Sequence, residues 1–350
     1  MNLRFFIFLL GCGLIAFSCK DKGKEDFDRS EMLENYSSII TSRYSDYSIA
    51  LSDLKTKTDG FTADATESNL SALELSYNTA YLNYQRIKMF DFGPMEEYTL
   101  TSKSNIYPTD TALILANISS TSTDFNAQAN YGAIGFPAID YLINARNDAQ
   151  ILIDFTSAER KNYLTGCVDK LISDFLLVNT KWNNEYIAQF KAANGNDVGS
   201  STSLMYNAFI KDVELLKNAK IGIPSGQQTG GMTLPSYVEG FYGNTSISLA
   251  KESCTTLKEI FNGEAGVGFD EYVRNVEGEV ETSIVDVVNN QFDLCLTKLD
   301  AISNLSVEVE SEFNRVNDAY KEIKTLITYL KTDVASLLGI LITFQDNDGD

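Results

Sequence analysis

The chain has 350 residues, with 28 Lys and Arg against 48 Asp and Glu, which gives a formal net charge of −20, and it contains no histidine. So acidic a protein repels phosphate backbones, which argues against nucleic acid as a partner. The absence of histidine excludes Ser-His-Asp and Cys-His catalysis, haem bound through a proximal histidine, and every metal motif that needs an imidazole. The 44% apolar content is enough for a packed core, and the length fits one large domain or two ordinary ones.

The first 18 residues have the features of a lipoprotein signal peptide. Arg4 gives a positive start, and the apolar run 5–17 is too short to span a membrane as a permanent helix. The run leads into Leu-Ile-Ala-Phe-Ser-Cys at residues 14–19, which has the form of a lipobox, although Phe17 is bulkier than a strict lipobox prefers. We therefore predict cleavage before Cys19 and lipidation of that cysteine.

A second lipobox-like sequence, Leu-Leu-Gly-Cys at residues 9–12, matches the local pattern more tightly but leaves a very short apolar run. Residues 19–29 are mostly charged and lack apolar periodicity, so we expect them to form a flexible tether. Without residues 1–18, which hold one of the basic residues, 27 basic residues face 48 acidic ones and the net charge is −21. The sequence thus predicts a lipid-anchored protein of the cell envelope, at the outer membrane, facing the periplasm or the exterior.

Apolar side chains recur at helical spacing through most of the remaining chain. In the N-terminal half they predict helices over 33–54 and 70–87. The predicted breaks are turn-forming or polar sequences: Asp59-Gly60 between the two helices, Gly93-Pro94 after the second, and the Ser-, Thr- and Asn-rich residues 99–130, in which Pro108 opens a short helix.

The same spacing predicts further helices in the C-terminal half, over 164–186, 247–261, 276–295 and 305–337, and one that starts near Ser203. Gly222 and Pro224 stop the helix that starts near Ser203. Residues 222–245 form the longest Gly-rich loop in the chain.

No segment shows the alternation typical of a strand, so the predicted fold class is all-α, with two antiparallel helical bundles. Each half has two helices, a Gly/Pro stop, a long irregular connection and then more helix, a pattern that indicates an internal duplication. We place the N-terminal bundle at 30–155 and the C-terminal bundle at 156–350. The second bundle is expected to open with a long helix that begins at Ser157 or Glu159.

Three cysteines remain beyond the signal peptide: Cys167, Cys254 and Cys295. An odd number cannot form a complete disulfide framework, and each of the three falls on an apolar helical stripe. We expect buried free thiols, with a bridge between Cys254 and Cys295 as the alternative.

The segment Gly-Phe-Pro-Ala-Ile-Asp-Tyr-Leu at residues 135–142 is the most distinctive motif. Pro137 suits the first turn of a helix because it lacks an N–H and fixes φ. Asp140 then lies near the helix N-terminus, where the dipole favours a negative charge. The motif can therefore be a helix start only, or it can supply Asp140 as a ligand.

This segment resembles the signature of the imelysin-like family, which in its fuller form reads Gly-x-His-x-x-Glu. Other stretches are similar to the same family in order and spacing: 90–94 (Phe-Asp-Phe-Gly-Pro), 106–110 (Ile-Tyr-Pro-Thr-Asp), 220–224 (Lys-Ile-Gly-Ile-Pro), 238–246 and 338–350. The resemblance implies an all-α protein of two related bundles with a functional cleft between them. It also implies an envelope protein, because family members are envelope proteins, some classed as metallopeptidases and others linked to iron uptake.

The chain departs from the family signature at its metal-binding positions. Gly135 is retained, but Pro137 stands where the family has His, and Asp140 stands where it has Glu. A His-x-x-Glu pair puts two metal ligands on one face of a helix. Proline cannot coordinate a metal through its side chain, so the remaining carboxylate could only join an oxygen site for a hard cation. A zinc peptidase mechanism is therefore poorly supported, and we assign no catalytic residue.

Carboxylates are the remaining candidates for a metal site, because the resemblance implies that the loops around the cleft approach Asp140. Asp140 and Glu239 are the first choice, and Asp91 and Glu97 the second, so the candidate cofactor is a divalent or iron cation held by carboxylates. The alternative for Glu97 and its neighbour Glu96 is that they are solvated loop charges.

Tyr131, Tyr141 and Tyr242 lie in or beside the same motifs, and we predict that they line a ligand site. The acidic end, Asp-Asn-Asp-Gly-Asp at residues 346–350, looks like the opening of a calcium loop. An EF-hand needs a Gly at its sixth position and a Glu at its twelfth, so an acidic tail is the preferred interpretation.

The sequence therefore predicts a lipid-anchored, non-catalytic, imelysin-like binding protein of the envelope, which takes part in uptake of iron, another metal or a metal-bearing ligand. The alternatives are an imelysin-type metallopeptidase and a surface protein that binds glycan or host protein. The cleft distinguishes these functions: an apolar, aromatic pocket favours an organic ligand, and converging carboxylates favour a cation.

Overall fold

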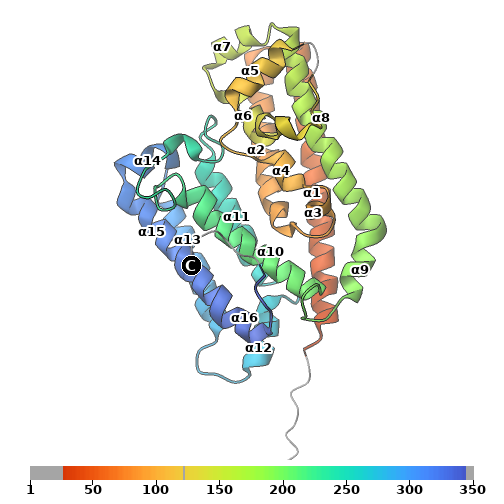
Figure 1. The fold of residues 1–350 in the computed structure, drawn as a ribbon, viewed down its shortest axis with the longest axis vertical. Helices are drawn as coiled ribbons and strands as arrows, with labels where there is room; N and C mark the ends of the chain where they lie inside the picture. The colour runs from red at the N-terminus through yellow and green to blue at the C-terminus, as the bar shows by residue number, and fades with distance from the viewer. Residues whose placement is uncertain (1–26, 121–122, 344–350) are drawn as a thin grey trace, which may run out of the picture.

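The computed structural model describes residues 27–120 and 123–343 (Figure 1). The two lipobox-like sequences, Cys19 and the acidic end 346–350 lie outside these residues. The described part of the chain consists of helices and their connections, with no strand, which confirms the predicted all-α class. No helix within it is both long enough and apolar enough to cross a membrane.

The N-terminal bundle is built on three long helices: α1 (Arg29–Ala63), α2 (Glu67–Ile87) and α8 (Ala158–Lys181). The first helix packs along both of the others. The predicted break at Asp59-Gly60 is wrong, because α1 continues through it and buries Phe61 beyond it. The turn falls instead at residues 64–66, where the Thr66 hydroxyl accepts a hydrogen bond from the Asn69 backbone N–H and caps α2.

Short helices connect α2 to α8: α3 (Pro94–Glu97), α4 (Leu100–Ser104), α5 (Thr111–Ser119), α6 (Gly135–Asn144) and α7 (Asp148–Asp154). Of these, α5, α6 and α7 lie near the top in Figure 1. Pro94 opens α3, as expected for a proline at a helix start. The short helix predicted at Pro108 begins later, at Thr111, because Asp110 accepts a hydrogen bond from the Leu113 N–H and caps it.

The C-terminal bundle contains these α-helices: α10 (Ser201–Leu215), α11 (Ser246–Phe261), α12 (Phe269–Glu277), α13 (Ile284–Asp300), α14 (Leu305–Ser311), α15 (Phe313–Thr328) and α16 (Ala335–Leu338). The predicted single helix over 276–295 is wrong. Gly278, with φ of +71°, ends α12, and Val280 of the predicted apolar stripe is 51% exposed. The predicted helix over 305–337 is likewise divided, between α14 and α15.

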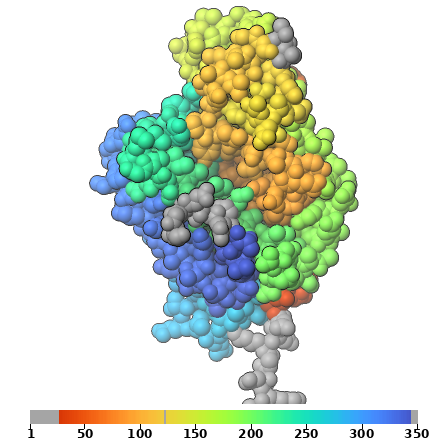
Figure 2. All heavy atoms as spheres, in the orientation of Figure 1, coloured from red at the N-terminus to blue at the C-terminus, as the bar shows by residue number. Residues whose placement is uncertain are grey.

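The helix predicted to open the C-terminal bundle, α8, packs against α1 and α6, and α9 (Ile187–Ala192) continues it along α1. By packing, residues 158–192 therefore lie with the N-terminal bundle, and the chain passes between the bundles at 193–200. In Figure 2 the N-terminal helices, in orange and yellow-green, meet the C-terminal helices, in green to blue, along one seam.

The two bundles are joined by buried and partly buried polar contacts. Arg43 of α1, 2% exposed, pairs with Glu259 at 2.7 Å and with Glu264. The Tyr36 hydroxyl donates to the Ile260 carbonyl at 2.9 Å and accepts from the Phe269 N–H at 2.9 Å. The three cysteines of the described chain are free and buried, as predicted.

Candidate functional site

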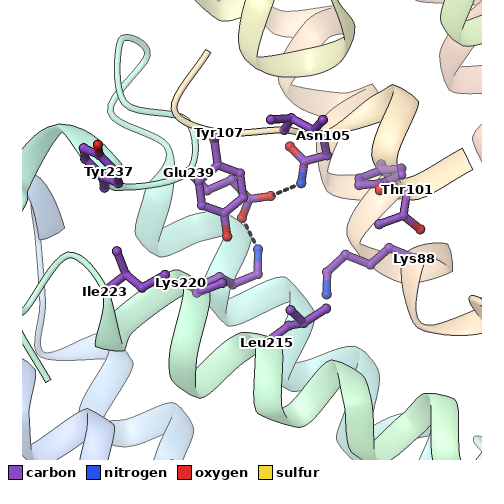
Figure 3. A pocket seen from close by; sticks show the side chains of 12 residues that line it. Lys88, Thr101, Asn105, Tyr107, Leu215, Lys220, Ile223, Tyr237 and Glu239 are labelled. Atoms are coloured by element: carbon purple, nitrogen blue, oxygen red, sulfur yellow. Dashed lines mark hydrogen bonds and ion pairs between the residues drawn. The ribbon is translucent and has the colours of Figure 1, made fainter. Parts of the chain in front are cut away.

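A pocket of about 250 Å³ lies between the bundles (Figure 3). Its lining comes from α2 and the turn after it (Tyr84, Lys88), from α4 and the following loop (Thr101, Asn105, Ile106, Tyr107), from the end of α10 and its continuation (Leu215, Ala219, Lys220, Ile223), and from the loop before α11 (Tyr237, Glu239). Both bundles therefore contribute side chains, as the predicted cleft requires.

Lys220 reaches the pocket from a π-helix. The helix α10 continues without interruption into η4 (Leu216–Gly222), whose wider turn is a conformation frequent at functional sites. The helix ends where the sequence predicted, at Gly222. A side chain there would meet the Lys217 carbonyl at 2.9 Å and the Tyr320 ring at 3.0 Å, which explains the glycine.

Glu239 is 1% exposed and lies at the floor of the pocket. It forms an ion pair with Lys220 and accepts hydrogen bonds from Gln85 Nε2 at 3.0 Å and Asn105 Nδ2 at 2.7 Å. Burial opposes its ionisation, but Lys220, Asn105 and Lys88 together outweigh burial and hold the pKa of Glu239 below its usual value. Burial lowers the pKa of Lys220 to about 8, so at neutral pH both partners are mainly charged.

Lys88 forms a second ion pair, with Asp212 of α10, and this pair also crosses between the bundles. Lys88 lines the pocket, whereas Asp212 does not. Both side chains are almost completely buried. The second carboxylate oxygen of Asp212 has no hydrogen-bond partner within residues 27–120 and 123–343.

Asp140 lies beside this pocket, in an adjoining cavity of about 150 Å³ that also contains Pro137, Tyr107 and Tyr242. Its carboxylate accepts hydrogen bonds from the backbone N–H groups of Tyr242 and Gly243 and from Asn144 Nδ2, each at 2.9 Å. Burial raises its pKa to about 6. Asp140 lies in the second turn of α6. Its hydrogen bonds therefore connect α6 to the loop before α11.

The other two predicted carboxylates lie elsewhere. Asp91 accepts a hydrogen bond from Thr101 Oγ1 at 3.1 Å and pairs with Lys211 at 2.6 Å. Glu97 is exposed and pairs with Lys181 at 2.7 Å, as the alternative of a solvated loop charge implied. The structure does not bring the four carboxylates together.

A catalytic metal does not fit the residues present at the motif. Within the described segments, no three Cys, Asp or Glu side chains are grouped so that they could hold a metal ion. Both oxygens of Asp140 face N–H donors, which is an arrangement for binding donors and not cations. Pro137 supplies no ligand, so no reaction step is derived through a metal at this position.

Gly135 is required by backbone geometry. Its φ is +74°, and a side chain at this position would collide with the Ser104 carbonyl. The motif glycine thus lets α6 begin directly against the end of α4. This close approach explains why the motif has glycine at this position without any contact to a ligand.

Of the three predicted tyrosines, Tyr242 lines the adjoining cavity. Its ring makes an edge contact with that of Tyr141, with centroids 5.2 Å apart. Tyr131 lies in the turn before α6 and packs against the core. The sequence motifs did not predict Lys88, Gln85, Asn105 or Lys220 as site residues. Lys220 nevertheless opens the Lys-Ile-Gly-Ile-Pro stretch, which is similar to the family.

The chain belongs to the imelysin family, which is designated a peptidase family: the family model matches residues 40–337. Among solved structures it is similar to a candidate iron-regulated protein A precursor from Parabacteroides distasonis ATCC 8503, at 16% identity and a TM-score of 0.74, over 89% of this chain and 95% of that one. An imelysin-like protein from Psychrobacter arcticum 273-4 is similar at 14% identity and a TM-score of 0.71, over 90% of this chain and 97% of that one. These similarities establish the fold. No curated protein matches the chain.

Proposed function

We propose that this imelysin-family chain is a non-catalytic binding protein of the bacterial cell envelope, anchored through a lipid on Cys19. It takes part in the uptake of iron or another metal that is carried by a small organic ligand. The inter-bundle pocket is the binding site. The lipobox supports the anchor, and the iron-regulated designation of the Parabacteroides protein supports the link to iron.

The observation that carries this proposal is the chemistry of the pocket lining. Aromatic and aliphatic side chains form most of its wall, and two ammonium groups, those of Lys88 and Lys220, lie at its floor. The carboxylates of Glu239 and Asp212 are each paired with one of these ammonium groups, which does not favour a bare cation. An apolar wall with a few fixed polar groups is typical of sites for organic molecules. A metal would therefore enter as part of a chelate.

The peptidase alternative requires a metal with an open coordination position and a general base. Asp140 has its oxygens hydrogen-bonded to N–H donors, and Pro137 replaces the histidine of the family signature. Neither Asp140 nor Pro137 is placed to hold a catalytic metal, so these residues favour a binding protein over a peptidase. Incubation with an unfolded protein substrate, with and without a chelator, tests the alternative, and chelator-sensitive cleavage would support it.

The proposal is tested on full-length protein purified from its native envelope. The protein is denatured, the extract is analysed by mass spectrometry, and metals are measured by elemental analysis before and after extraction. We expect a small organic molecule in the extract and a metal that leaves with it. The Ala219→Trp variant fills the pocket and should lose both, whereas Ala116→Trp, at an exposed position of α5, should keep both. A metal that stays with extracted protein would contradict the proposal.

A further inference from the structure

The charged groups that face the pocket are mainly positive. Of the described side chains that line it, Lys88 and Lys220 are cationic and Glu239 is the single carboxylate. Figure 3 shows the ammonium group of Lys220 turned toward the carboxylate of Glu239. Each lysine has a carboxylate partner, Asp212 for Lys88 and Glu239 for Lys220, so the four charges balance. Asp212 is not part of the lining, so the pocket surface itself presents two cationic side chains and one anionic side chain.

Both ammonium groups retain donors that the protein does not use. An ammonium group carries three N–H donors. Within the described chain Lys88 Nζ donates to Asp212 Oδ1, and Lys220 Nζ donates to Gln85 Oε1 and Glu239 Oε2. At least one donor on each lysine is thus available to a bound molecule.

Tyr84 brings a buried hydroxyl, without a partner among the described residues, to the wall of the same pocket. Its side chain is fully buried and lines the pocket, and its hydroxyl has no hydrogen-bond partner in the described part of the chain. Burial holds the pKa of Tyr84 well above its usual value, so the hydroxyl keeps its proton. A buried hydroxyl without a partner is costly, and a ligand acceptor would satisfy it.

The mouth of the pocket is apolar. Its partly exposed side chains are Ile106 at 37%, Leu215 at 37% and Tyr237 at 41%. Large apolar groups left in water around a polar floor indicate contact with the body of a bound molecule. The pocket thus has a donor-rich end and an apolar end.

Given the proposed binding function, on which this inference rests, we infer that the pocket selects organic anions. The carboxylate of the ligand accepts hydrogen bonds from Lys88, Lys220 and Tyr84, and its ring-sized apolar body lies against the mouth. A charge-assisted bond to each lysine is stronger than a neutral one, so the head group determines selectivity.

Three probes with one ring system and different head groups test this selectivity on the full chain: 2-naphthoate, 2-naphthalenemethanol and 2-naphthylmethylamine. Isothermal titration calorimetry at pH 7 measures the dissociation constant of each. We expect 2-naphthoate to bind at least about tenfold more tightly than the alcohol, because the alcohol oxygen carries no negative charge to pair with the two ammonium groups. The amine should bind most weakly.

Two variants assign the effect to named side chains. Lys88→Met with Asp212→Leu replaces the buried ion pair by apolar side chains and avoids an unpaired buried carboxylate. It should weaken 2-naphthoate binding by about tenfold and change alcohol binding less than about twofold. Tyr84→Phe should weaken 2-naphthoate binding by about threefold to tenfold. Lys251→Met, on the exposed surface of α11, is the matched control and should leave all three affinities unchanged.

The outcomes separate the two proposals. Equal binding of the alcohol or the amine, lost in Ala219→Trp, would overturn selection for anions and leave the organic-ligand pocket intact. Binding of none of the three probes would contradict both. Tight 2-naphthoate binding that survives in the Lys88 and Asp212 double variant and in Tyr84→Phe would also overturn the inference.

Discussion

Asp140 is a buried acceptor for donors that come from the other bundle. Its three hydrogen bonds, each 2.9 Å long, compensate for part of the cost of burying a charge. Burial still dominates, and the pKa of Asp140 rises to about 6 from a reference value of 3.8. Protonation of this one carboxyl group therefore affects the stability of the folded chain.

The pKa of Asp140 is higher in the folded state than in the unfolded state. Between about pH 4 and 6 the folded state therefore holds a proton on Asp140 that the unfolded state has lost. The contribution of Asp140 to the free energy of unfolding is most favourable below about pH 4. It is lost as the pH rises through about 6, by up to about 3 kcal/mol. Urea unfolding of wild type and Asp140→Asn from pH 4 to 7 measures this, since the difference in their unfolding free energies should fall with rising pH.

The exposed Ala149→Ser on α7, which changes no titratable group, is the control for this series and should show a constant difference from wild type. A constant difference for Asp140→Asn as well would contradict the assignment of a raised pKa to Asp140.

Among the helices, two positions occupied by glycine differ in whether they would accept a side chain. Gly135 opens α6 with a positive φ and direct contact to α4, whereas Gly60 is in the interior of α1 with open space around it. The helix α1 contains Gly60 although glycine is a poor helix former, because packing of its buried side chains outweighs the local preference.

Alanine substitution separates the two cases. Gly135→Ala should destabilise the protein by more than about 3 kcal/mol, because the side chain meets backbone and φ is unfavourable. Gly60→Ala should stabilise it by about 0.5–1 kcal/mol by restricting the unfolded chain and improving helix propensity. Chemical denaturation measures both values. A stable Gly135→Ala variant would show that α6 can start without the close approach to α4.

At the scale of the whole molecule, the proposed attachment to a membrane is through a lipid on Cys19. The acyl chains of a lipidated N-terminus supply about 0.8 kcal/mol for each buried methylene group. Cys19→Ser should therefore move the protein from the membrane fraction to the soluble fraction of cells. Cys12→Ser is the control and should remain in the membrane fraction. Release by Cys12→Ser instead would assign the lipid to the competing lipobox.

Helical periodicity predicted the elements of this molecule better than their ends. The long apolar stripes correspond to α1, α2, α8 and α15, since packing against neighbours requires the pattern itself. The predicted end of α1 was wrong. Asp59-Gly60 favours a turn locally, but packing of α1 against its neighbours keeps these residues helical. The boundary between the bundles along the chain depends on which helices α8 packs against. Helical periodicity does not reveal those contacts.

The sequence predicted where the candidate site lies, but it did not predict which groups contact its carboxylates. Asp140 and Glu239 both lie at the inter-bundle cleft, where the resemblance implied. Glu239 pairs with Lys220, and Asp140 binds backbone N–H groups about a hundred residues away along the chain. Carboxylates in a sequence suggest a bound cation. Whether a metal ion, a lysine or a backbone N–H group contacts them depends on contacts between residues that are far apart in the chain.

Native mass spectrometry of the protein purified from its own envelope shows whether the inter-bundle pocket holds a small organic ligand. We expect one adduct with the mass of a small organic molecule, alone or with its metal, on wild type and on Ala116→Trp. The same adduct should be absent from Ala219→Trp, in which the pocket is filled. A bare metal ion as the only adduct, or an organic adduct that persists in Ala219→Trp, would contradict the proposed binding function.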